Sequence, residues 1–452
     1  MRIILAIFSL LIMLLVSQNS TLTTWESAAV AMFVFFFLDF LNNLGKKIVI
    51  FDLTLLLAIG TCLVMPIVFY HYYTPQNKLA RIWVKWMRTP SDEYFAFALP
   101  AVAALAIGYR LPLGNLKINK NPQIYLTKMK EDLVNKADVG MKLIGIGLVS
   151  GLFSKVVPGA LQQFFFFLAH LIYVGVFYVI YSPSKHKKKI VPLVIFMMVG
   201  ESIAVGMFGE LIFTLAVTLI LILLGNNTPF YKKVLFALAG IYLVLLIQSV
   251  KMDYRRQAWT GGGADGLYFM ELIGDRVTSP SHMLDEEKSF LAAVRLNQGW
   301  LVSQTMYNVP RKFTFAYGET IWQSIAASFV PRFLWPDKPE AGGKANLMRF
   351  WGYRLQGYSM NIGPLGEAWG NFGQYGGMIF MFFYGLFFNA LMTGILKLSE
   401  KRPTIILWIP FLFTGTVTVE SDLLTTMNTL TKGLFFTWLI FKAFKITVDV
   451  DL

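Results

Sequence analysis

The sequence predicts an all-α polytopic membrane protein with about twelve transmembrane helices and one large polar loop late in the chain. Three observations lead to this prediction. Of 452 residues, 56% are hydrophobic and only 15% are charged, with a mean hydropathy of +0.57, which is too apolar for a soluble protein. Apolar runs long enough to cross a bilayer recur along the chain. Eight of the thirteen arginines fall in one polar stretch, residues 251–374.

Twelve apolar segments are predicted as spans, because a transmembrane helix needs about 17–25 mostly apolar residues. They cover residues 2–18, 25–43, 48–70, 93–109, 140–158, 160–181, 190–206, 208–225, 232–250, 376–396, 404–419 and 426–445. The chain therefore divides into a nine-helix region (1–250), an extracytoplasmic catalytic or cap loop (251–375) and three C-terminal helices (376–452).

Lysine-rich loops predict the orientation of these spans. With Arg2 inside, strict alternation places five basic loops on the cytoplasmic side: 46–47, 110–139, 184–189, 232–233 and 397–402. Both termini are then cytoplasmic and residues 251–375 face outward. The first segment could instead be a signal peptide, although no small-x-small cleavage site follows it. Whether residues 1–18 are retained does not change the direction of the later helices.

One basic loop lies on the opposite side. Residues 72–92 are predicted outside, yet they carry Lys78, Arg81, Lys85 and Arg88 at helical spacing among tryptophans and other apolar residues. This pattern is typical of a helix lying in the membrane interface. It serves either as a basic anchor with no role in substrate binding, or as a border for an anionic lipid headgroup.

Several function classes are excluded by composition. The net charge of +14 is largely explained by the lysine-rich loops, so nucleic-acid binding is not expected. Cys62 is the only cysteine, which rules out an intrachain disulfide and a thiolate metal cluster. The four histidines show no ligand spacing, and the outer segment has no Asp-x-Asp pair. We therefore expect no metal and no cofactor.

The arginines of the outer segment are the first candidates for a binding site. Guanidinium forks bind phosphate or carboxylate oxygens in bidentate fashion, so their segregation predicts that an anion is handled there. The candidates near helix ends or in rigid turns are Arg255, Arg256, Arg276 and Arg332. The alternative is structural, because the segment holds eleven acidic residues against thirteen basic ones, and half or more of the arginines could be salt-bridge partners.

Two motifs in the outer segment supply further candidates. Residues 331–339, PRFLWPDKP, contain three prolines and predict a rigid turn, which either anchors at the interface through Trp335 or aims Arg332 and Lys338 at an anion. Residues 363–373, GPLGEAWGNFG, run into the next span. Glu367 in this motif either complements a helix dipole or acts as a site acid or base.

Two acids between the last two spans join these candidates. Glu420 and Asp422 lie in an outer loop, on the same side as the arginine-rich segment. Acidic residues at the membrane are costly and are default candidates for function.

Together these features resemble the Wzy-type oligosaccharide repeat-unit polymerases of bacterial surface polysaccharide pathways. Over the whole chain the resemblance lies in the number of helices and the large late loop. Sequence motifs are shared only across roughly residues 251–373. The matched positions are Arg332, Trp335, Pro336, Lys338, Pro339, Glu367, Asn371 and Gly373.

The resemblance implies a GT-C-like glycosyltransferase in the bacterial cytoplasmic membrane, with the outer loop capping a cavity. Its substrate would be a glycan repeat on undecaprenyl pyrophosphate, and a chain-length regulator and a flippase of the same pathway would be partners. Arginines led by Arg255, Arg276 and Arg332 would stabilise the pyrophosphate leaving group, with Arg256, Lys338, Trp335 and Asn371 also in the binding site. Glu367 would be the leading base, followed by Asp422 and Glu420.

Two other functions fit the same architecture. An O-antigen ligase-like enzyme would move finished glycan to a non-polyprenyl acceptor. Such ligases usually use a histidine in an outer loop. Apart from His71 at the edge of a predicted span, His282 is the only candidate for that histidine. A lipid-linked glycan transporter or flippase is the other, although no internal repeat or broken midplane helix is visible in the sequence. The sequence does not distinguish the sugar, the linkage or the stereochemical outcome.

Overall fold

The computed structural model describes residues 2–114, 118, 121–134, 136–154, 156–206, 208–259, 265–283, 285–332, 334–356, 358–416 and 419–448. Within these ranges every regular element is a helix, apart from one isolated bridge between Leu44 and Lys47. The prediction of an all-helical membrane protein is confirmed.

Seven helical segments in the described part of the chain are long and apolar enough to cross a membrane. They are α1 (Arg2–Asn19), α2 (Thr24–Asn43), the continuous run of α3 (Ile50–Ile59), η1 (Gly60–Val64) and α4 (Met65–His71), α6 (Ser91–Arg110), the Phe164–Tyr181 segment of α10 (Gly159–Ala169) and α11 (Leu171–Tyr181), α14 (Phe230–Trp259) and α20 (Gly363–Leu398). Each coincides with a predicted span.

The other five predicted spans are not confirmed, so the twelve-span count stays a prediction. The predicted segment 140–158 corresponds to α9, which has only 17 residues, and 208–225 corresponds to α13, which has 15. Most of the segment 190–206 lies in α12, which begins with three lysines, while 404–419 is divided among η3, α21 and η4. The segment 426–445 lies in α22 (Leu423–Val448), which carries three lysines. The bounds of the remaining helices before the outer segment are α5 (Lys78–Trp83), α8 (Pro122–Val134), α9 (Ala137–Phe153), α12 (Lys187–Val205) and α13 (Gly209–Leu223).

The outer segment folds into short helices rather than an open loop. It contains α15 (Gly266–Thr278), η2 (Pro280–Met283), α16 (Glu286–Leu296), α17 (Gly299–Asn308), α18 (Glu319–Phe329) and α19 (Lys344–Trp351). After α20 the chain continues through η3 (Pro403–Trp408), α21 (Ile409–Phe413), η4 (Thr414–Thr416) and α22 (Leu423–Val448). The predicted domain boundaries at 250/251 and 375/376 fall inside α14 and α20, because both helices extend beyond their apolar spans.

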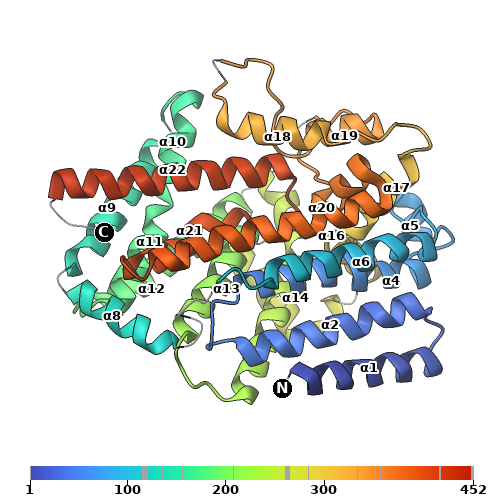
Figure 1. Cartoon of the computed structure of the whole chain (residues 1–452), viewed down its shortest axis with the longest axis horizontal. Coiled ribbons are helices and arrows are strands. Elements are labelled where there is room, and N and C mark those ends of the chain that lie inside the picture. Colours follow the sequence, from blue (N-terminus) through green and yellow to red (C-terminus); the bar gives the residue numbers. More distant parts are fainter. Residues whose placement is uncertain are drawn as a thin grey trace.

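Helices α6 and α20 lie side by side and run in the same direction (Figure 1). The Gln374 amide donates to the Ala96 carbonyl at 3.3 Å near the start of both helices, and Asn389 donates to the Gly108 carbonyl at 3.0 Å near the end of α6. Their backbones touch at two glycines. A Cβ on Gly108 would stand 2.3 Å from the Phe382 carbonyl oxygen, and one on Gly385 would stand 2.6 Å from the Leu105 oxygen. Small residues permit this approach, as is common between membrane helices.

Buried charges tie the neighbouring helices together at one end of α6. Arg110, its last residue, lies 2.9 Å from a fully buried Asp39 carboxylate of α2 and also pairs with Asp52 of α3. Lys47 adds a 3.1 Å contact to Asp52. Because removing one member of a buried ion network leaves an uncompensated charge, this cluster fixes the arrangement of three helix ends.

The start of α6 is held by a second polar cluster. Glu26, buried at the beginning of α2, accepts a hydrogen bond from the Ser91 hydroxyl at 2.8 Å and lies 3.0 Å from His71 at the end of α4. The two clusters therefore lie at opposite ends of the same helices. This second end also carries the short helices of the outer segment, since Thr89 and Ser303 of α17 exchange hydrogen bonds there.

Helix α20 bends before it enters its predicted span. Gly373 has φ +66° and ψ −155° within the helix, a backbone conformation that residues with a side chain rarely adopt. The bend separates an initial segment that carries Glu367 and Asn371 from the apolar segment 376–396. The first segment contacts α18 through Asn371, and the second contains the predicted span.

We predict that the glycine contact between α6 and α20 is essential for stability. Gly385→Ala should lower the free energy of unfolding by about 1–3 kcal/mol, because its new methyl group would overlap the Leu105 carbonyl. Gly394→Ala is the matched control on the same helix, since a Cβ there meets nothing within 4 Å. Thermal unfolding of the purified variants in detergent measures the difference. Equal transitions for the two variants would contradict the proposed packing role.

Candidate functional site

Two of the predicted acids meet at the beginning of α22. Asp422 precedes this helix, and its carboxylate accepts from the Thr425 amide at 2.8 Å and from the Gly343 amide at 2.9 Å. Glu367 Oε1 accepts from the Leu423 amide at 2.7 Å. Orphan amides at a helix start favour carboxylates, which explains why both acids gather there.

Glu367 is fully buried. Its Oε2 has no hydrogen-bond partner within the part of the chain that the structure describes, and the Asn346 side chain of α19 interacts with the same carboxylate. The predicted leading base therefore lies behind the protein surface. This burial suits a residue that positions its neighbours better than one that meets a substrate directly.

Asn371 connects α20 to α18. Its side-chain amide donates to the Thr320 hydroxyl at 2.7 Å and to the Glu367 carbonyl at 2.9 Å, and its oxygen accepts from the Gly318 amide at 3.1 Å. Asn371 is completely buried, so all of these bonds are internal. Through these bonds Asn371, a predicted substrate-binding residue, fixes the start of α18.

A pocket opens between α18, α19 and the beginning of α22. Its cavity volume is about 50 Å³, within about 380 Å³ of empty space that includes the open solvent at its mouth. Seven of its ten lining residues are polar or charged: Glu319, Thr320, Gln323, Ser324, Asn346, Arg349 and Asp422. The mixture of hydrogen-bond donors and acceptors fits a ligand that carries many hydroxyl groups.

An ion pair stands at the rim of this pocket. The guanidinium Nε of Arg349 lies 3.5 Å from a Glu319 carboxylate oxygen, and the same arginine donates to the carbonyls of Thr314 and Phe315. About half of the Glu319 side chain is exposed, at 53%. Of the three acids near the pocket, Glu319 is thus the one that a ligand reaches most easily.

A group of cations lies around Glu420, which is separated from Asp422 by one residue. Arg295 of α16 contacts the Glu420 carboxylate at 3.0 Å. Lys251, one turn before Arg255 on α14, interacts electrostatically with Arg255, Arg295 and Glu420. Arg255 lies near Arg295 and Lys251, and its Nε donates to the Gly206 carbonyl at 2.8 Å. Cations gathered in this way favour an anionic ligand. We call Lys251, Arg255 and Arg295 the α14–α16 cation group.

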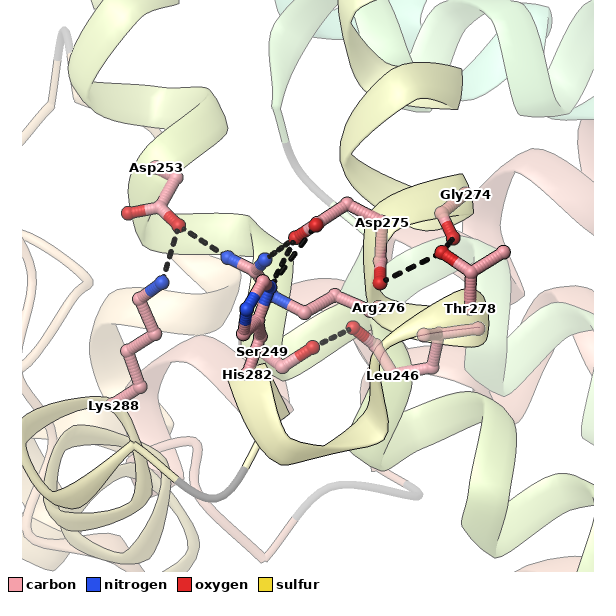
Figure 2. Close-up of polar contacts among 9 residues, drawn as sticks. All are labelled: Leu246, Ser249, Asp253, Gly274, Asp275, Arg276, Thr278, His282 and Lys288. Carbon is pink, nitrogen blue, oxygen red and sulfur yellow. Dashed lines mark hydrogen bonds and ion pairs between the residues drawn. The ribbon is translucent and has the colours of Figure 1, made fainter.

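Arg276 is not part of this group. Figure 2 shows its guanidinium between two aspartates, donating to Asp253 at 2.8 Å and also to Asp275. Arg276 is buried, and Lys288 of α16 lies 3.2 Å from the same Asp253 carboxylate. The salt-bridge alternative therefore describes Arg276 better than a phosphate clamp does.

His282 completes the polar network around Arg276. Its Nδ1 lies 3.0 Å from the Asp275 carboxylate (Figure 2). The hydrogen bond from His282, with added attraction from Arg276, lowers the pKa of Asp275. The network holds η2 against α14 and α15, and this position gives His282 a structural partner.

The proline-rich turn has mainly local contacts. Lys338 donates to the carbonyls of Ala327 and Val330 at 2.9 and 3.0 Å, so it caps the end of α18. Burial and the neighbouring Arg332 lower the pKa of Lys338. Arg332 is exposed and donates to the Pro336 carbonyl at 3.1 Å, while Trp335 is half-buried. Of this turn, Pro339 alone lines the pocket. Arg256 lies exposed on α14 and is not among the pocket residues.

Sequence reasoning gave no role to Glu319 or Asn346. A single acid in a Tyr-Gly-Glu-Thr stretch and an asparagine in a short amphipathic helix carry no recognisable motif. Their importance depends on α18 and α19 packing near the start of α22, which is a long-range contact. The available sequence signal was a glycine before each helix, Gly318 and Gly343. Both adopt positive φ in the structure, which marks a fixed helix start.

Comparison with known proteins gives one match. The chain belongs to a family described as a domain of unknown function, DUF8712, which matches residues 110–398. No curated protein and no solved structure matches the chain significantly. The matched region includes α14 to α20, and therefore the cation group and most of the pocket, but not the 419–422 turn.

We predict that Arg276 stabilises the fold. Arg276→Ala should lower the free energy of unfolding by about 1–3 kcal/mol, because it leaves Asp253 and Asp275 without their buried partner. Both aspartates are about one-third exposed, so solvent screening limits the loss. Arg354→Ala, at an exposed arginine of the same segment, should have little effect. Denaturation of both variants in detergent measures this. Wild-type stability of Arg276→Ala would restore Arg276 as a candidate ligand contact.

Proposed function

We propose that this protein polymerises oligosaccharide repeat units linked to undecaprenyl pyrophosphate, on the outer face of the bacterial cytoplasmic membrane. One observation carries the proposal: a pocket of mixed polar groups and a group of three cations flank the same turn. Asp422 lines the pocket and Glu420 faces the cations, and the Cα atoms of these two residues are at most ~7 Å apart along the chain. A sugar site beside an anion site is what transfer from a glycosyl pyrophosphate requires.

The reaction forms one bond and breaks one. The acceptor hydroxyl oxygen attacks the anomeric carbon of the donor glycan, and the bond from that carbon to the pyrophosphate oxygen breaks. The hydroxyl proton moves to a carboxylate, and undecaprenyl pyrophosphate leaves with the bonding electrons. Negative charge grows on the leaving group, so fixed cations lower the barrier if they lie beside it.

The α14–α16 cation group is assigned to the pyrophosphate. Arg255 was one of three leading candidates from the sequence, and its Nε donates to the Gly206 carbonyl at 2.8 Å. Lys251 and Arg295 take the places of Arg276, which pairs with Asp253 and Asp275, and of Arg332, which donates to the Pro336 carbonyl. Lys251 and Arg255 are one helical turn apart and therefore lie on the same face of α14. This helix is also a candidate span, so its cations are suited to meet a phosphate at the membrane surface.

Glu319 is assigned as the base. A base must come within hydrogen-bond distance of the hydroxyl whose proton it takes. Glu319 lines the pocket and is half-exposed, whereas Glu367 is fully buried and both oxygens of Asp422 already accept backbone amides. Glu367 and Asp422 are assigned to positioning: they hold the start of α22 and Asn346 against the pocket.

Replacement of the proposed base tests this assignment in cells. In the native host lacking the chromosomal gene, Glu319→Gln should reduce long polysaccharide by about 100-fold or more and cause single lipid-linked repeats to accumulate, because proton transfer to a positioned group contributes about that much. Gel analysis of surface and lipid-linked glycans gives the measurement.

Glu340→Gln is the matched control. Glu340 is an exposed glutamate of the same segment that pairs with Lys344 and does not line the pocket, so polymer should form normally. If Glu319→Gln, expressed at the wild-type level, restored full-length polymer, the assignment of Glu319 would fail. If deletion of the gene left all glycans unchanged, the proposed function itself would fail.

A further inference from the structure

A second group of cations lies away from the pocket, where the segment between α5 and α6 packs on α17. Lys85 Nζ stands 3.6 Å from the centre of the Trp300 ring. The Tyr307 ring is approached by Arg311 at 4.9 Å, by Arg88 at 5.7 Å and by Lys312 at 5.9 Å. We call Lys85, Arg88, Arg311 and Lys312, with the Trp300 and Tyr307 rings between them, the cation–aromatic patch.

The positive charge of the patch is poorly balanced. Glu93, 3.7 Å from Arg311, is the one carboxylate that forms an ion pair with the patch within the described ranges. Burial lowers the pKa of Lys85 to about 8. Each cation gains from a ring face, yet the cations repel one another. An external anion would relieve that repulsion.

The backbone under the patch is fixed. The Ser303 hydroxyl oxygen accepts from the Arg88 amide at 2.8 Å and from the Thr89 amide at 2.9 Å, and the Thr89 hydroxyl donates to the Ser303 carbonyl at 2.9 Å. Both Thr89 and Ser303 are buried. The cations of two distant segments are thus held together in advance, so binding an anion there costs little ordering.

The surroundings of the patch place it at a membrane surface. Lys85 and Arg88 lie between α4 and α6, and both helices belong to candidate spans. Three apolar residues just before Lys85 are exposed: Ile82 at 61%, Trp83 at 43% and Val84 at 52%. Apolar and tryptophan side chains beside cations are typical of a segment lying in the interface, with its charges at the level of the headgroups.

We propose that the cation–aromatic patch binds the phosphate of an anionic glycerophospholipid, with Ile82, Trp83 and Val84 inserted among the acyl chains. The inference is independent of the proposed enzymatic function. A lipid is favoured over a soluble anionic partner because the exposed apolar residues adjoin the cations, and a soluble anion would leave them in water. The lipid would hold the α5 segment, and with it α17, at a constant depth in the membrane.

Lipid retention by the purified full-length protein tests the proposal. The protein is exchanged into neutral detergent with equal amounts of phosphatidylglycerol and phosphatidylcholine, and bound lipid is counted by native mass spectrometry. We expect phosphatidylglycerol to be retained preferentially. The double variant Arg88→Gln/Lys312→Gln should reduce its affinity by about tenfold or more, since each basic residue near an anionic surface contributes about 1 kcal/mol.

The matched control replaces one lysine and one arginine elsewhere in the outer segment. Lys344→Gln/Arg354→Gln removes the same charges from exposed positions and should keep the preference. Equal retention of both lipids by the wild type would overturn the proposal, and so would an equal loss in the control. Displacement of phosphatidylglycerol by millimolar inorganic phosphate would also overturn it, since the site would then recognise an anion without its acyl chains.

A measurement on the wild type keeps the proposal testable if the double variant does not fold. Photoactivatable phosphatidylglycerol with its reactive group near the phosphate should crosslink to peptides that contain residues 82–90 or 307–312. Crosslinks confined to other parts of the chain would reject the site.

Discussion

The contact between α6 and α20 is the constraint on which the remainder of the structure depends. Gly108 and Gly385 allow the two backbones to touch, and hydrogen bonds from Gln374 and Asn389 fix their relative height. Charged clusters then hold both ends of α6 to α2 and to the α3–α4 run. Because α20 bends at Gly373, this fixed bundle determines where its first segment, with Glu367 and Asn371, meets the outer helices.

That first segment of α20 organises the outer layer. Asn371 holds α18, and Glu367 holds the start of α22 beside Asp422. The outcome is one turn with a polar pocket on one side and three cations on the other. Glu420 and Asp422 are separated by one residue, Ser421. Asp422 lines the pocket, whereas Glu420 pairs with Arg295 of the cation group. Glu367 and Asp422, two of the acids predicted from the sequence, both accept backbone amides at or near the start of α22.

Much of the fold could be predicted because it depends on local patterns. Apolar length alone identifies α1, α2, α6, α14 and α20, and the positive-φ glycine at 373 agrees with a span starting just after it. The site was harder. From residue type and position along the chain, Arg276 and Arg255 were equally good candidates. In the structure Arg276 pairs with Asp253 and Asp275, whereas Arg255 donates to the Gly206 carbonyl and lies near Arg295. Such differences arise from long-range packing, as does the role of Glu319, and residue type and spacing do not determine them.

Elongation by the purified protein tests the central claim most directly. The protein, in detergent and without nucleotide sugars, would be given undecaprenyl-pyrophosphate-linked repeat units from its host. Our account predicts a ladder of longer lipid-linked glycans, because donor and acceptor are both lipid-linked and no membrane has to be crossed. A folded, monodisperse protein that leaves the single repeats unchanged would contradict the account and favour transport or another transfer reaction.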